Sequence, residues 1–315
     1  MTDSGVVLVT GATGFVGAAL LPVLIMKGWT IRALTRQEIL PASAGRLAWH
    51  RAEGFDDELP LEGCSVVVHL AARVHVMHEH MRDPLAEFRR VNVELTERLA
   101  RRASAAGVRR FVYLSSVKVN GEETSPGRAY LADDIPKPED AYGVSKCEAE
   151  IALRRVAAET GLEVVIIRPP LVYGPGVKGN FKTMLRWLEH GLPLPLRSVN
   201  NRRSLISVDN LCDLISLCLT HSKAANETFL ASDDRDLSTP ELLFMAGVAI
   251  GRPALLFPFP KSCLEWGAAL LGRRGVMRRL CGDLQVDIEK TRSVLGWAPV
   301  IDVETGLCRV FVNKV

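Results

Sequence analysis

The stretch TGATGFVG, residues 10–17, decides the fold of this chain. An apolar run, VVLV (residues 6–9), precedes it, and a helical pattern follows from Phe15 to Lys27 and stops at Gly28. Glycines at such a strand-to-helix turn allow a tight bend, a close approach of the backbone to a pyrophosphate, and close packing of the helix on the strand. The stretch therefore predicts the phosphate-binding turn of a dinucleotide fold, in which the first N–H groups of the helix face the ligand.

Strand and helix signals alternate through the first half of the chain, which is the pattern of a parallel sheet covered by helices. After Arg168 prolines become frequent, and this change in texture predicts a smaller second lobe. We predict an α/β fold, with a Rossmann-type doubly wound parallel sheet in residues 1–170. A smaller C-terminal substrate lobe is expected in residues 171–315, with about residues 204–222 returning to the main domain. The predicted strands are residues 6–9, 30–34, 46–50, 66–70, 111–114 and 164–167, and the long helices are residues 84–106 and 141–160.

The composition is that of a globular chain. Its 315 residues are 48% hydrophobic and 24% charged, with a formal net charge of +3. The basic residues form no long run interleaved with aromatic residues, so we expect no nucleic-acid partner. The N-terminus has no basic, cleavable leader, and the longest apolar stretch, residues 242–271, is interrupted by charges and prolines. We therefore expect no secretory signal, no transmembrane segment and a cytoplasmic location, and a membrane-surface contact through this stretch stays open.

Cysteines and histidines give no clear metal pattern. Seven cysteines are scattered without a CxxC pair, which indicates reduced thiols rather than a disulfide framework or a zinc site. His75, His78 and His80 cluster, but we favour solvated loop residues over a metal site and expect no metal. We interpret a basic, apolar segment further on as a surface helix, with a membrane contact as the alternative. Its arginines are Arg273, Arg274, Arg278 and Arg279.

The end of the second predicted strand bears on which dinucleotide binds. An acidic residue there would hydrogen-bond the ribose hydroxyls of NAD. The stretch IRALTR (residues 31–36) has no carboxylate, and Arg36 could instead hold the 2′-phosphate of NADP. We favour NADP(H) as the cofactor and keep NAD as the alternative. The alternative interpretation of Arg36 is a solvated surface charge.

A catalytic pair is predicted at the start of a long helix. In YGVSK (residues 142–146) the spacing of four places Tyr142 and Lys146 on one helix face. An ammonium beside a phenol favours the phenolate, so we expect a lowered pKa of Tyr142 and proton exchange near neutral pH. Ser115 and Ser116 end the fifth strand at the carboxyl edge of the sheet, where such folds bind ligands. We expect a hydroxyl there to share the substrate oxygen.

Six motifs, in this order, resemble the extended short-chain dehydrogenase/reductases: TGATGFVG, VVVHLAA, YLSSVKVNG, YGVSK, RPPLVYGPG and RRSLISVDN. The resemblance runs from about Val6 to about Pro299 and is closest to the branch of the UDP-galactose 4-epimerases and nucleotide-sugar 4-ketoreductases, in the NAD-dependent epimerase/dehydratase family. It implies that Ser116, Tyr142 and Lys146 form the catalytic triad.

The same resemblance implies two sets of binding residues. Asn180 and Arg203 would contact the diphosphate of a nucleotide-sugar substrate beside Ser116, and an arginine offers a planar fork for phosphate oxygens. Pro169 and Pro170 would lie near the nicotinamide. The expected cofactor-binding residues are Gly11, Thr13, Gly14, Phe15, Val16, Gly17, Arg36, Ala71, Ala72, Ser115, Tyr142, Lys146 and Pro169.

Departures from the family pattern bear on the reaction. Dehydratases carry an Asp-Glu pair where this chain has Val117 and Lys118, so we reject a 4,6-dehydratase. Epimerases usually show the acidic residue after the second strand, and often a tyrosine where Asn120 stands and an asparagine where Leu171 stands. Each departure weakens the epimerase interpretation without excluding it.

Our main hypothesis is a 4-ketoreductase of a nucleotide-activated, UDP-type hexose in bacterial polysaccharide synthesis. Tyr142 would donate the proton, Ser116 would hydrogen-bond the reacting oxygen, and Lys146 would hold the cofactor ribose. The first alternative is a UDP-hexose 4-epimerase that retains NAD. The second is a non-catalytic dinucleotide sensor, against which the intact triad speaks. By analogy with the family we also expect a homodimer.

Overall fold

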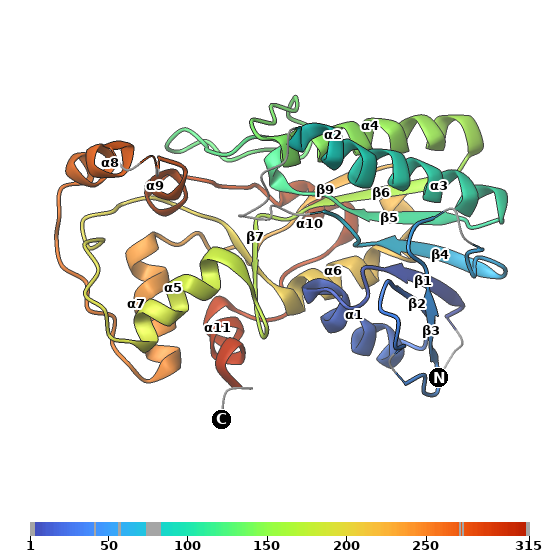
Figure 1. Cartoon of the computed structure of the whole chain (residues 1–315), viewed down its shortest axis with the longest axis horizontal. Helices are drawn as coiled ribbons and strands as arrows, with labels where there is room; N and C mark the ends of the chain where they lie inside the picture. The colour runs from blue at the N-terminus through green and yellow to red at the C-terminus, as the bar shows by residue number, and fades with distance from the viewer. Residues whose placement is uncertain are drawn as a thin grey trace.

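The computed structural model describes residues 4–40, 42–55, 58–73, 83–270, 272 and 274–312. A sheet with helices on both faces makes up one part of the molecule, and a smaller, largely helical lobe lies beside it (Figure 1). The strands of the main sheet are β1 (Val6–Thr10), β2 (Thr30–Thr35), β3 (Leu47–Arg51), β4 (Cys64–His69), β5 (Arg110–Leu114), β6 (Glu163–Arg168) and β9 (Thr228–Leu230). Within the described residues these seven strands lie in the order β3-β2-β1-β4-β5-β6-β9, and every neighbouring pair is parallel. This arrangement confirms the predicted Rossmann-type sheet.

The central strands are buried on both faces. In β1 the side chains of Val7, Leu8 and Val9 are 0% exposed, and Val7 lies in register with Ile31 of β2 and Val66 of β4. Near-continuous apolar runs of this kind are typical of parallel strands that helices cover on both sides. All six predicted strands form, with ends that differ by at most two residues, whereas β9 was not among them.

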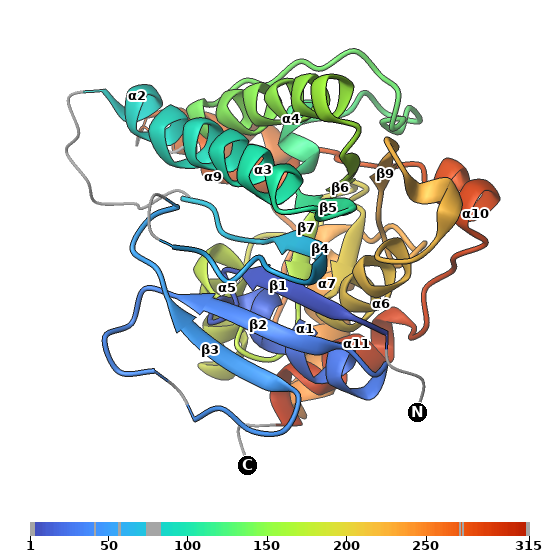
Figure 2. The ribbon, with the colours of Figure 1, turned by 90° about the vertical axis from the view of Figure 1, so that its right-hand side faces the viewer.

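Helices cover the two faces of the sheet (Figure 2). On one face α1 (Phe15–Met26) packs against α6 (Val208–Cys218), and on the other α3 (Leu95–Ala105) packs against α4 (Ala141–Thr160). The helix predicted over residues 84–106 is not continuous. It consists of α2 (Pro84–Arg89), a π-helical turn η1 (Arg90–Glu94) and α3.

The second half of the chain builds the smaller lobe and also returns to the sheet. β7 (Leu171–Tyr173) and β8 (Leu205–Ser207) form a separate two-stranded parallel sheet. A third hydrophobic cluster fills the lobe around Phe181, Leu243 and Leu307. β9 joins the edge of the main sheet, and α6 packs against α1 on one face of it. The domain boundary expected at residue 170 stays a prediction. The remaining helices are α5 (Gly179–Glu189), α7 (Thr239–Ile250), α8 (Lys261–Leu270), α9 (Arg274–Cys281), α10 (Glu289–Leu295) and α11 (Val303–Val312).

Several sequence features outside the sheet can now be placed. His75, His78 and His80 lie outside the described residues. Trp266 and Leu270 of α8 are exposed on the surface of the lobe. In the part of the chain that the structure describes, no helix is both long and apolar enough to cross a membrane.

Candidate active site

Contacts between backbone atoms shape the turn between β1 and α1. Gly11 has a φ of +68°, and a Cβ placed on it would lie 2.7 Å from the backbone N of Ala71. A Cβ on Gly17 would meet the carbonyl O of Gly11 and lie 2.7 Å from the Cα of Ala12. The turn therefore closes only with glycine at these two positions.

The N-terminus of α1 is open to an anion. Gly14 is the N-cap and offers no side chain to the first N–H groups of the helix. The first turn of α1, all of which the structure describes, contains no acidic residue. Thr13 and Gly14 are exposed, Phe15 and Val16 are half-buried, and Gly17 is buried. The free N–H groups and the positive end of the helix dipole fit the pyrophosphate of a dinucleotide.

Thr10 and His69, at the ends of β1 and β4, hold the loop that follows β4. The Oγ1 of Thr10 lies 2.7 Å from Nδ1 of His69 and accepts the N–H of Ala71 at 3.2 Å. Ala71 is thereby fixed against Gly11, and Ala72 follows it with its side chain half-buried. The structure thus brings Ala71 beside the glycine turn, and Ala72 follows it in the chain.

Lys146 of α4 is buried, with 2% of its surface exposed. Its Nζ donates to the carbonyl O of Leu114 at 2.8 Å and lies 4.5 Å from the ring centroid of Tyr113. Burial lowers the pKa of Lys146 to about 7, although the carboxylate of Glu150 opposes this shift. Burial, and then the charge of Lys146, lower the pKa of His69 to about 3. Lys146 therefore exchanges its proton near neutral pH beside a neutral histidine.

Tyr142 lies in the first turn of α4, on the helix face that carries Lys146. The Nζ of Lys146 is 5.9 Å from the centroid of the Tyr142 ring, and the ring of Phe88 meets it edge-on at 6.1 Å between centroids. The expected lowering of the Tyr142 pKa is wrong for this structure, because burial, and then the carboxylate of Asp140, raise it. The hydrogen bond of Lys146 goes to the carbonyl of Leu114, so desolvation of the phenolate dominates.

Ser116 and Ser115 face different surroundings. Ser116 is half-buried and caps a 3₁₀ turn, η2 (Val117–Val119), where its Oγ accepts the N–H of Lys118 at 3.3 Å. Ser115 is buried, and its Oγ donates to Oε1 of Glu150 at 2.5 Å. Of the two serines only Ser116 is partly exposed, which fits its predicted catalytic part. The cofactor contact expected of Ser115 stays a prediction.

Two buried polar features were missing from the predicted site. Asn92, in η1, donates from Nδ2 to the carbonyl O of Arg73 at 3.1 Å and to Oγ of Ser145 at 3.0 Å, and so ties the loop after β4 to α4. Glu150 of α4 pairs with Arg168 at the end of β6, 2.6 Å apart. A π-helical turn often marks a functional site, but the sequence pattern around Asn92 is that of an ordinary helix. In the sequence, the asparagine within this expected helix was the one available signal.

The other predicted residues are spread more widely. Pro169 is buried directly after β6, and Arg36 is exposed directly after β2. Arg203 lies in the lobe, where its Nη1 donates to the carbonyl O of Gly282 at 2.9 Å and burial lowers its pKa. Asn180 belongs to α5, and its side chain is not among those described. Ligand contacts of Arg36, Asn180 and Arg203 therefore stay predictions.

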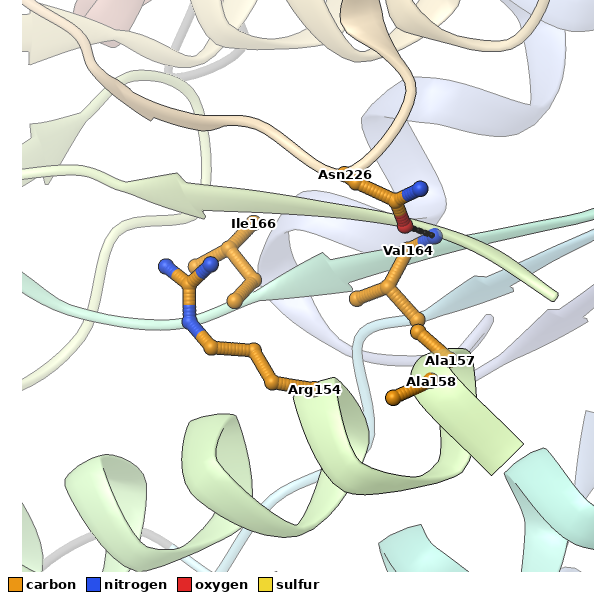
Figure 3. Close-up of a pocket in the computed structure, with 6 residues that line it drawn as sticks. All are labelled: Arg154, Ala157, Ala158, Val164, Ile166 and Asn226. Atoms are coloured by element: carbon orange, nitrogen blue, oxygen red, sulfur yellow. Dashed lines mark hydrogen bonds between the residues drawn. The ribbon is translucent and has the colours of Figure 1, made fainter. Parts of the chain in front are cut away.

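A pocket of about 300 Å³ lies between α4 and β6, away from these residues (Figure 3). Within it the Oδ1 of Asn226 accepts the N–H of Val164 at 3.0 Å. Because it contains no predicted site residue and no cluster of titratable groups, we do not assign the site to it. Its lining residues are Arg154, Ala157, Ala158, Val164, Ile166 and Asn226.

Comparison with known proteins tests the resemblance. The model of the NAD dependent epimerase/dehydratase family matches residues 7–231. This chain belongs to that family. It is 43% identical over 312 residues to a UDP-glucose 4-epimerase of Vibrio cholerae, a match that covers 95% of this chain and 92% of the relative. The resemblance inferred from the motifs and the prediction of an NAD(P)-dependent enzyme are confirmed.

Solved structures share the architecture. The UDP-glucuronic acid 4-epimerase of Bacillus cereus, solved in complex with NAD, is similar with a TM-score of 0.79 at 20% identity, over 97% of this chain and 95% of that one. MoeE5, solved in complex with UDP-glucose and NAD, is similar with a TM-score of 0.75 at 26% identity, over 98% and 97% of the two chains. These likenesses confirm the fold over nearly the whole chain. The preference for NADP(H) over NAD stays a prediction.

Proposed function

We propose that this chain interconverts the two C4 epimers of a UDP-hexose and retains its NAD. The 43% identity to a UDP-glucose 4-epimerase, extending over 95% of the chain, carries the proposal. This identity favours the UDP-hexose 4-epimerase, which the sequence left as the first alternative, over the 4-ketoreductase. Both reactions act at the same carbon with the same side chains, so the geometry of the site supports either one, and the relative supports the epimerase.

The residues of the site would share the work at C4. Tyr142 removes the proton of the C4 hydroxyl and returns it. Ser116 donates a hydrogen bond to the same oxygen, and Lys146 holds the cofactor ribose. When bound at the glycine turn, NAD supplies the hydride acceptor and donor for C4. Epimerisation requires the sugar to present both of its faces to these groups, whereas reduction requires one.

Substrate binding is assigned to the lobe. We propose that Arg203, together with Asn180, binds the diphosphate of UDP. Among the described residues Arg203 forms no ion pair with a carboxylate, its side chain is half-buried, and burial lowers its pKa. A buried guanidinium is stabilised by a phosphate that it can contact with two N–H groups. The homodimer and the cytoplasmic location expected from the sequence stay predictions.

Two observations favour the 4-ketoreductase as the second candidate. Arg36 is exposed directly after β2, in a stretch without a carboxylate, where it could contact the 2′-phosphate of NADP(H). Burial, and then Asp140, raise the pKa of Tyr142, which keeps the phenol protonated and able to donate to the oxygen of a 4-keto sugar.

The test has two parts. The freshly purified protein is denatured and the released dinucleotide is identified. Separately, the native protein is incubated with UDP-glucose or UDP-N-acetylglucosamine without added cofactor. We expect about one NAD per chain and an equilibrium mixture of C4 epimers, measured by NMR, with no net redox change. An empty site, tight NADPH binding and NADPH consumption with a 4-keto UDP-sugar would establish the reductase instead. Dinucleotide binding without turnover of either substrate would indicate the sensor.

A further inference from the structure

Lys118 lies between the two segments that carry Ser116 and Tyr142. Its backbone N–H donates to Oγ of Ser116 at 3.3 Å. Its carbonyl O would lie 2.8 Å from a Cβ placed on Gly143, so η2 and the first turn of α4 are in direct contact. Its Nζ donates to Oδ2 of Asp140 and forms an ion pair with it. We call the place where the turn of Ser116 meets the first turns of α4, with Tyr142 and Lys146, the catalytic corner. Lys118 therefore contacts both of its segments, through its backbone and its side chain.

Asp140 has two effects at the start of α4. Its Oδ1 accepts the N–H of Gly143 at 2.7 Å and caps the helix. Its charge lies two residues before Tyr142 and adds to burial in raising the pKa of that phenol. Lys118 bonds the other carboxylate oxygen, so its ammonium offsets a negative charge that disfavours the phenolate.

Other charged groups face this ion pair from neighbouring segments. The Nζ of Lys118 also donates to Oε1 of Glu122 at 2.8 Å, and Arg278 of α9 bonds both Glu122 and Glu139. Burial opposes ionisation of Glu122, but hydrogen bonds from Lys118 and Arg278 outweigh it and lower its pKa to about 2. Hydrogen bonds to Glu122 and Glu139 raise the pKa of Arg278, so Glu122 and Arg278 stay charged near neutral pH. The groups that face Tyr142 itself are Asp140 and Lys146 of α4, Tyr113 of β5 and the uncharged ring of Phe88 from α2.

We propose that Lys118 is a positioning residue, which through Asp140 fixes the first turn of α4 against the turn of Ser116 and balances the carboxylate charge beside Tyr142. The inference rests on the proposed function, since it concerns the proton that Tyr142 exchanges with the C4 oxygen. Lys118 touches neither substrate nor cofactor in this role. Its effect reaches the reaction through the position and the acidity of Tyr142.

The test compares four variants by the pH dependence of kcat/KM: Lys118→Met, Lys118→Arg, Asp140→Asn, and Lys118→Met combined with Asp140→Asn. In Lys118→Met the pH midpoint at which activity rises should move up by about 0.5–1 unit, because the charge of Asp140 is no longer offset. Lys118→Arg keeps the charge and should follow the wild type. Asparagine still caps the helix, so Asp140→Asn should move the midpoint down through loss of charge alone.

The double variant decides whether Lys118 acts through Asp140. With Asp140→Asn already present, Lys118→Met should move the midpoint much less, because the carboxylate charge nearest Tyr142 is gone and only the pair of Lys118 with Glu122 remains to be lost. Lys27→Met, which removes an exposed Lys-Asp pair with Asp213 at 3.0 Å, serves as the matched control and should leave the profile unchanged. An unchanged midpoint in Lys118→Met, or an equal shift in both backgrounds, would overturn the proposal.

Thermal unfolding of the same variants gives a readout that needs no turnover. Lys118→Met should lower the melting temperature more in the wild-type background than in the Asp140→Asn background, because the Lys118–Asp140 ion pair is lost only in the first, whereas the Lys118–Glu122 pair is lost in both. Equal losses in the two backgrounds would overturn the coupling of Lys118 to Asp140. Absence of C4 chemistry in the wild type would instead overturn the proposed function, and the two failures are thus distinguishable.

Discussion

The glycine turn and the catalytic corner depend on different physical properties. In the turn, residues 10–17, backbone atoms lie so close together that a Cβ on Gly11 or Gly17 has no room. In the corner, Lys146 is buried with a pKa lowered to about 7, and the pKa of Tyr142 is raised by burial and then by Asp140. A site defined by shape fails when atoms are added to it. A site defined by buried charge fails when a proton or its partner is removed.

The largest effect should follow from removing one oxygen at the corner. Tyr142→Phe deletes the proton-exchanging group but keeps the ring that packs against Phe88. We expect turnover of the UDP-hexose to fall by about 10²–10⁴-fold, the usual contribution of general acid–base catalysis. Dinucleotide content and melting temperature should stay near those of the wild type. NMR of the two C4 epimers measures turnover, and release of the cofactor from denatured protein measures the dinucleotide content.

Tyr130→Phe is the matched control for this change. The hydroxyl of Tyr130 donates to the carbonyl O of Glu123 at 2.7 Å and has no assigned part in the reaction. Its loss should change turnover by less than about twofold, since exposed or half-buried hydrogen bonds contribute about 1 kcal/mol to stability and nothing to the chemistry. A Tyr142→Phe variant as active as Tyr130→Phe would remove Tyr142 from the proposed mechanism.

A smaller effect should follow from adding one carbon to the turn. In Gly17→Ala the new Cβ meets the carbonyl O of Gly11 and the Cα of Ala12. We expect the free energy of unfolding to fall by about 1–3 kcal/mol, the usual result of overpacking. Dinucleotide affinity, measured by fluorescence titration, should fall by about 5–150-fold. Gly267→Ala in α8, where a Cβ has no neighbour within 4 Å, should bind as the wild type does. Normal binding by Gly17→Ala would mean that shape does not define this region.

The last effect concerns pH and builds up gradually over several pH units. Burial lowers the pKa of Lys146 from 10.5 to about 7, so between these values the unfolded chain holds a proton that the folded chain has released. Stability therefore rises with pH across this window, by at most ~1.4 kcal/mol per pH unit for one proton. The measurement is the free energy of unfolding of the wild type and of Lys146→Met, from denaturant curves at pH 6 to 10. Above pH 7 the wild type should gain stability relative to Lys146→Met as the pH rises. A difference that is flat in pH would contradict a buried, titrating Lys146.

Most of the sheet could be predicted because its signals are local. The apolar run before the glycine turn becomes β1, and Val66 to Val68 become the core of β4, since such runs need burial on both faces. β9 was missed because it is three residues long, and its strand conformation comes from pairing with β6, which is far away in the sequence. The π-helical turn around Asn92 was missed because its interruption of the helix follows from tertiary contacts to Arg73 and Ser145.

The site was predictable in its residues and less so in its electrostatics. Spacing places Tyr142 and Lys146 on one helix face, and the structure keeps them there. The direction of the Tyr142 pKa shift was wrong because burial, the larger cause, depends on which segments pack together, and sequence spacing carries no such information. The second cause, the carboxylate of Asp140, is local in the sequence and was left out of the prediction. The two adjacent serines were distinguished by the family resemblance alone, which implied Ser116 as the catalytic one, and the hydrogen bond from Ser115 to Glu150 gives a physical difference between them.

The position of β9 at the edge of the sheet has a consequence for biosynthesis. β6 ends at Arg168, but its outer neighbour β9 begins only at Thr228, after β7, α5, β8 and α6. A ribosome releases the chain from its N-terminus, so the apolar strand β6 leaves the exit tunnel long before the strand that covers its edge. An uncovered edge of this kind can pair with another nascent chain on the same polysome. Chaperone occupancy on translating ribosomes should therefore peak after residue 168 emerges and decline once Leu230 is free to dock.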